Sequence, residues 1–508
     1  MNPINSARSR IVLPLFIAGA CLMPAANAHA QNGAWLTHSH DEQHTALSTV
    51  GSQALNSIHW HAPVDLHPPS GEIFIHYGSP LVTAANTVIV PVKTGTNSFR
   101  VEAHSGATGK RLWMESTAYQ APEADFVPGM GPTISGNQLF VPDIAGSVLV
   151  RQNPDAAKGT VSRLYFYGLK NFNHDPAAYK TNVQIDTPLS ADANGNLFFG
   201  FLALGSTPLN LQSGLARISA SGAGTWVSAA ALSGDSSITE VSISCAPALS
   251  ADGSILYVAV DNGTWGYLLA VNSTTLALIG KVRLTDPASG MDAWIYSGSS
   301  ATPTVGPDGD VYFGVLENPY PSHNDRGWLL HYSSDLTQTK IPGSFGWDDT
   351  PSIVPATLVP SYKGKSQYLL MTKYNNYCSL GTGNGQNRIA ILDPNATEKD
   401  PIISSTNVMK EILTILGPTA DPDCPGGVKE WCINSAAVDP VNKSILANSE
   451  DGNLYRWDLT NNTLSQTIKL STGIGEAYTP TVIGADGTAY AINDAILDAV
   501  GTDSANTP

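Results

Sequence analysis

The sequence predicts an all-β protein folded as a β-propeller, and three observations carry this prediction. The 508 residues include 46 Gly and 34 Pro but only 13% charged residues, a composition unlike that of helical bundles and coiled coils. A unit of two short strands joined by a turn recurs along the chain, and a third and often a fourth strand follow it. Four antiparallel strands repeated radially form a propeller.

The repeat organises the whole chain. Each copy opens with a small residue and Pro, runs through a short strand, and crosses a turn rich in Asp, Asn and Gly into a hydrophobic strand. The eight copies are marked by Pro80, Pro132, Pro188, Pro247, Pro303, Pro351, Ala436 and Pro480. Their mean spacing of about 57 residues is slightly above that of known propeller blades. We therefore expect eight four-stranded blades, with seven as the alternative because the interval from Pro351 to Ala436 is irregular.

The two ends of the chain carry separate predictions. Residues 1–30 have the pattern of a secretory signal peptide, in which Arg8 and Arg10 precede an apolar run and Ala28-His29-Ala30 offers a cleavage site. The remaining residues, 31–508, are expected to form a single propeller domain, exported to the periplasm or secreted. Lipid anchoring at Cys21 is the less favoured alternative. A strand near residues 57–61 is expected to complete the last blade and hide its open edge.

The composition also limits the partners. Acidic residues outnumber basic residues by 42 to 26, and the formal net charge is −16. Because nucleic-acid binding depends on neutralising phosphates with Lys and Arg, nucleic acid is excluded as a partner. Beyond the first thirty residues, no apolar run is long enough to form a transmembrane segment.

One segment resembles a known family. Residues 103–113, Ala-His-Ser-Gly-Ala-Thr-Gly-Lys-Arg-Leu-Trp, are similar to the tryptophan signature of the pyrroloquinoline-quinone-like (PQQ-like) propellers, which include quinoprotein alcohol dehydrogenases and outer-membrane assembly lipoproteins. Trp35 and Trp60 are similar to the segment that precedes the first blade in that family. The resemblance implies the fold, whereas function is not implied, because one fold hosts many activities. The adjacent cysteines of the alcohol dehydrogenases are missing from this chain, and their calcium and quinone ligands cannot be matched residue by residue.

The repeat predicts where a site would lie. In a propeller, the loops leading into the innermost strands and the loops joining the second and third strands open on one face. Acidic and aromatic residues are frequent in these segments and suit a sugar, a cation or a quinone ring. The ligand-binding candidates on this channel face are His76, Tyr77, Asp186, Asp292, Trp294, Tyr296, Trp347, Asp348, Asp349, Glu430, Trp431, Glu476 and Tyr478.

Two functions remain open on these grounds. The favoured one is a binding or scaffolding module without a cofactor, whose partner is a protein, a glycan or a small molecule at the channel mouth. The alternative is an oxidoreductase that acts on alcohols or sugars with PQQ and calcium, in which Asp186, Asp348, Asp349 or Glu476 serves as calcium ligand or general base.

Cysteine and histidine give further candidates. Four cysteines lie beyond residue 30, and an even number in an exported chain favours disulfides. We expect a bond between Cys424 and Cys432, with Cys245 and Cys378 as the second pair. Histidines gather early in the chain, where the pairs His38-x-His40 and His59-x-His61 have a spacing that can bind zinc or copper. An exposed, polar N-terminal segment is the simpler interpretation.

Overall fold

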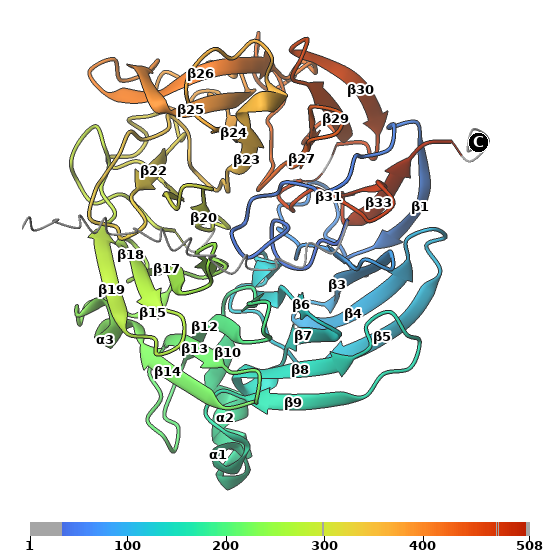
Figure 1. Ribbon diagram of the computed structural model, residues 1–508, viewed down its shortest axis with the longest axis vertical. Helices are drawn as coiled ribbons and strands as arrows, with labels where there is room; N and C mark the ends of the chain where they lie inside the picture. Colours follow the sequence, from blue (N-terminus) through green and yellow to red (C-terminus); the bar gives the residue numbers. More distant parts are fainter. Residues whose placement is uncertain (1–32, 297–298, 474, 476, 504–508) are drawn as a thin grey trace, which may run out of the picture.

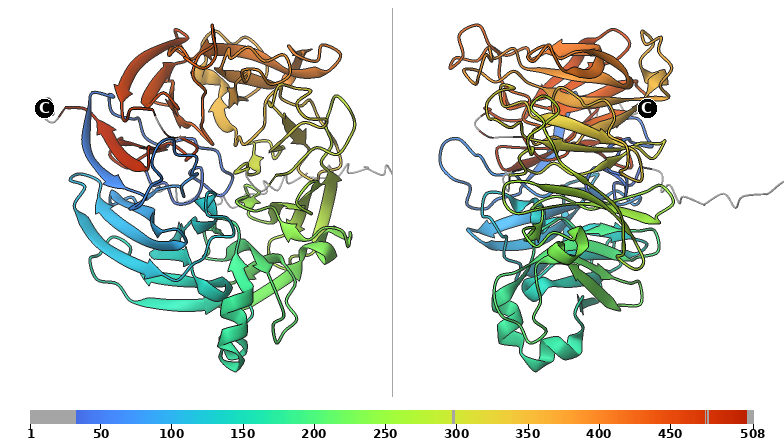
Figure 2. Two further views of the ribbon diagram at one scale, coloured as in Figure 1. Left: turned by 180° about the vertical axis from the view of Figure 1, so that it is seen from behind. Right: turned by 90° about the vertical axis from the view of Figure 1, so that its left-hand side faces the viewer.

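The computed structural model describes residues 33–296, 299–473, 475 and 477–503, and these form a ring of eight β-sheets around a central axis (Figure 1). The prediction of an eight-bladed β-propeller is therefore confirmed. The predicted signal peptide and Cys21 lie outside the described residues. Chain order runs once around the ring, and the side view shows that the ring is a thick disc (Figure 2).

The first four blades share one plan, in which each strand pairs antiparallel with the next from the axis outward. In blades 3 and 4 the innermost position is divided between two short strands that both pair with the second strand. The strands are, in blade 1, β2 Leu81–Val82, β3 Thr87–Gly95, β4 Ser98–Ser105 and β5 Arg111–Thr117; in blade 2, β6 Thr133–Ser135, β7 Gln138–Pro142, β8 Ser147–Gln152 and β9 Val161–Tyr165; in blade 3, β10 Val183–Ile185, β11 Ser190–Ala191, β12 Leu197–Ala203, β13 Gly214–Ile218 and β14 Gly224–Ser228; in blade 4, β15 Glu240–Val241, β16 Ala248–Leu249, β17 Ile255–Asp261, β18 Gly266–Asn272 and β19 Leu278–Arg283.

The other four blades differ in two places. Blade 5 has three regular strands, and two isolated bridges, Leu329 with Gly343 and Tyr332 with Thr339, stand where its outer strand would pair. In blade 8 the outer strand is β1, from the start of the chain. The strands are, in blade 5, β20 Thr304–Val305, β21 Val311–Val315 and β22 Trp328–Tyr332; in blade 6, β23 Ser352–Pro355, β24 Tyr368–Tyr374, β25 Arg388–Lys399 and β26 Asn407–Leu416; in blade 7, β27 Ala437–Asp439, β28 Ser444–Asn448, β29 Asn453–Asp458 and β30 Thr463–Lys469; in blade 8, β31 Val482–Ile483, β32 Ala489–Asn493, β33 Ile496–Gly501 and β1 Ser57–Pro63.

Helices are few and lie in the connections. The α-helices are α1 Leu169–His174, α2 Pro176–Asn182 and α3 Ala229–Ser233, and the 3₁₀ helices are η1 Val127–Met130, η2 Ile144–Gly146 and η3 Ala356–Leu358. The α1–α2 pair projects from the rim between blades 2 and 3 (Figures 1 and 2). Within the part of the chain that the structure describes, no helix has the length and apolarity needed to cross a bilayer.

The Asp-Gly turns explain why the strands reverse where the sequence predicts. In the turn between β16 and β17, Asp252 Oδ1 accepts a hydrogen bond from the Ser254 backbone N–H at 3.0 Å, and Gly253 adopts a φ of +70°. This left-handed conformation strains residues that carry a Cβ, so Gly is favoured there. The same arrangement recurs at Asp308-Gly309 and Asp486-Gly487.

The segment before β1 crosses the centre of the ring and contacts most of the blades (Figure 1). Backbone hydrogen bonds join it to the innermost strands or their turns in seven blades. These bonds are Trp35 with Val82, Leu36 with Ile134, Glu42 with Leu249, Gln43 with Val305, Thr45 with Ile353, Ala46 and Ser48 with Val438, and Gln53 with Gly487. We call residues 33–53 the central plug, because they lie in the central channel, against the innermost strands and the turns that follow them.

Blade 8 is completed by both ends of the described chain. β1 pairs antiparallel with β33, from Ser57 opposite Gly501 to Pro63 opposite Ile496. Trp60 on β1 is buried, and its Nε1 donates to the Gly106 carbonyl of blade 1 at 2.7 Å. Trp113, at the end of blade 1, makes the equivalent bond to Pro154 of blade 2, also at 2.7 Å. The tryptophan of the family-like signature therefore docks one blade on the next.

The closing tryptophan provides a test of this docking. Trp60→Ala removes a buried ring and its hydrogen bond, so we expect the free energy of unfolding to fall by about 3–5 kcal/mol. Trp60→Phe keeps most of the packing and loses the hydrogen bond, which is worth about 1 kcal/mol. Urea unfolding followed by tryptophan fluorescence measures both. Equal effects of the two substitutions would contradict a role for ring packing in closure.

Candidate functional site

The channel face is built from the two kinds of loop that the repeat predicts. Cys378 follows the second strand of blade 6, and Cys424 lies in the segment leading into blade 7. The two form a disulfide with a Cα–Cα distance of 6.0 Å. In blade 7, Ser449 Oγ, which follows the second strand, donates to the carbonyl of Glu430, which precedes the innermost strand, at 3.4 Å. Loops of both kinds therefore meet on one face.

Three of the predicted residues meet near the axis. The rings of His76 and Tyr478 stack with their centroids 4.0 Å apart. His76 Nδ1 lies 3.9 Å from Asp348 Oδ2, although His76 precedes blade 1 and Asp348 precedes blade 6. Asp348 is held by the Ser300 backbone N–H at 2.6 Å and by its hydroxyl at 2.7 Å. These contacts therefore join the segments that lead into blades 1, 6 and 8.

A buried lysine lies beside this group. Lys373, in β24, is fully buried, and its Nζ is 4.8 Å from the ring centroid of Tyr478 and 5.8 Å from that of Phe345. Its Nζ has no hydrogen-bond acceptor among the described residues. Asp349 is also buried, and burial raises the pKa of its carboxyl to about 8, although the charge of Lys373 opposes this rise. A buried amine beside a carboxyl group that is largely protonated at neutral pH is a polar pair suited to an anionic or carbonyl ligand.

Acidic side chains also gather on the side of blades 3 and 4. Asp186 is fully buried, and neither of its carboxylate oxygens receives a hydrogen bond from another residue in the described ranges. Its carboxylate packs against Gly200, where a Cβ would lie 2.4 Å from Oδ1. Burial raises the pKa of Asp186 well above its usual value, with a further contribution from Glu240. Burial and the charge of Asp261 likewise raise the pKa of Glu240 to about 7.

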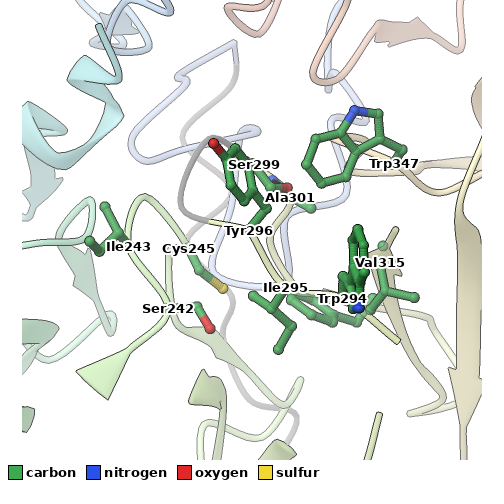
Figure 3. A pocket seen from close by; sticks show the side chains of 12 residues that line it. Ser242, Ile243, Cys245, Trp294, Ile295, Tyr296, Ser299, Ala301, Val315 and Trp347 are labelled. Atoms are coloured by element: carbon green, nitrogen blue, oxygen red, sulfur yellow. Dashed lines mark hydrogen bonds between the residues drawn. The ribbon is translucent and has the colours of Figure 1, made fainter. Parts of the chain in front are cut away.

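An aromatic recess lies between the segments that lead into blades 4, 5 and 6 (Figure 3). It is shallow, with a cavity volume of about 10 Å³, and its lining includes Trp294, Tyr296 and Trp347, with Ser242 and Cys245 opposite the two tryptophans. Tyr296 is 58% exposed, and its ring centroid lies 6.4 Å from that of Trp347. Trp294 and Trp347 are half-buried. The recess therefore offers aromatic surface to a ligand that approaches from solvent.

Other predicted residues are engaged elsewhere. Asp292 forms a two-bond ion pair with Arg283 at 2.7 and 2.8 Å, and Arg283 lies over the Trp265 ring. The Tyr77 hydroxyl donates to Asp65 at 3.1 Å. Trp431 is fully buried and packs edge-on against Tyr455. Glu476 lies outside the described residues, and Glu430 belongs to a separate cluster discussed below.

The predicted disulfide pairing was wrong. The bond joins Cys378 to Cys424, not Cys424 to Cys432 or Cys245 to Cys378. The loop that carries Cys378 lies against the segment around Cys424, as shown by a hydrogen bond from Gln386 to the Gly426 carbonyl at 2.7 Å. Cys245 and Cys432 lie outside the bond, and both are buried. The repeat predicts that all four cysteines lie on the channel face, but it does not predict the distances between their sulfur atoms.

The early histidines do not form an exposed segment. His38 and His44 lie in the central plug, both are buried, and their rings meet edge to face at 5.6 Å. His44 Nδ1 lies 2.8 Å from the Pro303 carbonyl, to which it donates. Burial lowers the pKa of His38 to about 3 and that of His44 to about 4. His59 instead contacts the Thr502 carbonyl at the outer edge of blade 8. The structure therefore buries His38 and His44 in the plug and places His59 elsewhere, whereas His61 and His67 are exposed.

Lys373 is the residue that our sequence reasoning missed. The signal was present, because the strand Tyr-Leu-Leu-Met-Thr-Lys-Tyr, residues 368–374, is otherwise typical of a fully buried strand. A lysine within such a strand is costly to bury and is therefore a functional candidate.

Comparisons with known proteins support the fold alone. No protein-family model and no curated protein sequence matches the chain. Among solved structures, a europium-containing methanol dehydrogenase is 10% identical with a TM-score of 0.55, over 90% of this chain and 89% of that one. The quinohemoprotein alcohol dehydrogenase from Comamonas testosteroni is 12% identical with a TM-score of 0.53, over 94% and 78%. Sqt1 from Saccharomyces cerevisiae is 10% identical with a TM-score of 0.50, over 89% and 100%. The resemblance to quinoprotein propellers is thus confirmed as one of fold.

The buried histidines give a prediction about pH. In the unfolded chain His38 and His44 bind a proton near pH 6.5, whereas in the folded chain they do so only near pH 3 and pH 4. Acidification below pH 6.5 therefore favours the unfolded state by about 1 kcal/mol per pH unit for each histidine. His44→Asn retains an amide donor for Pro303, so its unfolding free energy should decline less between pH 6.5 and 4 than that of the wild type. Urea unfolding at several pH values compares the two slopes. Parallel slopes would contradict the assignment.

Proposed function

We propose that the protein is an exported propeller module that binds a glycan through the aromatic recess of its channel face. The observation that carries this proposal is the grouping of Trp294, Tyr296 and Trp347 around one shallow recess, with the Tyr296 ring open to solvent. Aromatic faces pack against the apolar faces of sugar rings, and Ser299 lines the same recess with its hydroxyl group. The net charge of −16 supports a neutral or cationic ligand over a polyanion.

Export to the periplasm or medium is part of this proposal. The disulfide between Cys378 and Cys424 supports it, because such bonds persist mainly in oxidising compartments. The pattern of residues 1–30 supports it from the sequence side.

Substitutions in the recess test the binding function. We expect Trp347→Ala and Trp294→Ala each to weaken binding of the preferred oligosaccharide at least about tenfold, because tryptophan rings at a binding surface contribute much of the binding energy. A glycan array followed by isothermal titration calorimetry identifies the ligand and measures affinity. Trp226→Ala is a matched control, because Trp226 is half-buried on the outer strand of blade 3. Equal affinity of all variants, or the absence of any glycan ligand, would overturn the proposal.

An oxidoreductase that uses PQQ and calcium is the second candidate, and the unmatched polar atoms at the mouth favour it. The Asp186 carboxylate fits a calcium ion, and the Lys373 ammonium fits a carboxylate of the quinone. Asp349, whose pKa is raised to about 8, would serve as general base above that pH, where it is ionised. The quinone would supply the oxidising group. The stack of His76 on Tyr478 and the contact of His76 with Asp348 count against it, because they occupy the axis.

Reconstitution separates the two candidates. A quinone-dependent enzyme should retain PQQ after incubation with calcium and gel filtration, which absorbance detects, and should reduce a dye in the presence of alcohols or sugars. Lys373→Ala should then lower PQQ retention at least about tenfold, because a buried charge partner is lost. Lys110→Ala, in an exposed turn of blade 1, should have no effect. If no quinone is retained and no dye is reduced, this candidate fails.

A further inference from the structure

A second group of reactive side chains lies on blade 7, apart from the recess and from Lys373. Glu430 and Cys432 precede β27, and Glu450 lies between β28 and β29. One ligand atom from each, two carboxylate oxygens and the thiol sulfur, lie within 4.8 Å of one another. The Cys432 thiol points to Glu450 Oε2 at 3.4 Å and lies 3.9 Å from Glu430 Oε2.

The backbone holds these side chains in place. Residues 430–432 lie in the segment before β27, where Trp431 is fully buried and the side chains of Glu430 and Cys432 both face Glu450. Asn375 fixes the run from blade 6, because its side chain accepts from the Trp431 N–H at 3.2 Å and donates to the Trp431 carbonyl at 3.3 Å. Ser449 ties the Glu450 loop to the Glu430 carbonyl. The arrangement is therefore set by packing from two blades.

The charges around the group favour a cation. Lys429 Nζ contacts Glu450 Oε1 at 3.2 Å and Asp421 at 3.4 Å, and Oε2 of Glu450 faces the thiol. Two carboxylate oxygens and a sulfur atom that face one another provide three ligand atoms for a positive ion. Cys432 is 2% exposed and lies outside the disulfide of the described chain, whereas Glu430 and Glu450 are half-buried and reach towards solvent.

We propose that Glu430, Cys432 and Glu450 bind a zinc ion on the channel face. Thiolate and carboxylate oxygen are both zinc ligands, whereas calcium and magnesium take oxygen alone. On binding, the Cys432 thiol releases its proton to solvent and the sulfur bonds to the metal. Three protein ligands leave a fourth tetrahedral position for water or a ligand atom. This inference is independent of glycan binding, because the recess uses other side chains.

Cobalt provides the direct experiment, because its bond to a thiolate gives a charge-transfer absorption band. The full chain is stripped with a chelator, titrated with Co²⁺ and then with Zn²⁺, and analysed for bound metal. We expect one zinc per chain, a cobalt–thiolate band, and its loss when zinc displaces cobalt. Cys432→Ser should abolish the band and weaken zinc binding at least about tenfold, and Glu450→Gln should keep the band at a similarly reduced affinity.

Cys245→Ser is the matched control, because Cys245 is also buried and outside the disulfide but belongs to no such cluster in the described ranges. This variant should keep both the band and the zinc affinity. If Cys432→Ser fails to fold, protection of Cys432 from alkylation by zinc in the wild type serves in its place. A wild type without the band, a band that survives Cys432→Ser, or a Cys432 that zinc leaves open to alkylation would overturn the proposal.

Discussion

The closure of the ring is the constraint on which the rest of the structure depends. Each blade alone would leave exposed edges and apolar faces, and burial of these surfaces requires neighbours on both sides. The N-terminal part of the chain meets this requirement twice. It supplies β1, which pairs with β33, and before that the central plug, which bonds to the innermost strands or turns of seven blades. Closure at the rim and at the centre therefore comes from one continuous segment.

The plug also determines the chemistry of the mouth. Because the plug fills one end of the channel, it excludes water from that side of the residues around the axis. Asp186 and Lys373 stand out among the residues of the channel face, since both are fully buried and their side-chain polar atoms have no hydrogen-bond partners in the described part of the chain. Burial of such groups costs several kcal/mol in general, and it is usually tolerated where a ligand or a reaction uses them.

The fold could be predicted from the sequence because each repeat is defined by residues close together in the chain. Proline or alanine before each inner strand, Asp-Gly at the turns, and Trp113 at the blade junction act over a few residues and are visible in the chain. The central plug and the Cys378–Cys424 bond depend on contacts between distant segments, so neither could be derived from spacing. The site was predicted in part. The aromatic residues Trp294, Tyr296 and Trp347 lie together, whereas Asp292 and Trp431 are used for packing and ion pairing.

Burial lowers the negative charge that the acidic residues of the channel face carry at neutral pH. The sequence suggests a strongly negative mouth, but burial raises the pKa of Glu240 to about 7, that of Asp349 to about 8, and that of Asp186 well above its usual value. At neutral pH these groups are therefore largely or partly protonated, and much of the net charge of −16 must lie elsewhere on the surface. A neutral sugar that enters the aromatic recess would then meet less electrostatic competition than the composition implies. His76 and Asp348 occupy the axis itself, whereas Tyr296 at the aromatic recess is exposed to solvent. A ligand from solvent therefore meets the recess and not the axis.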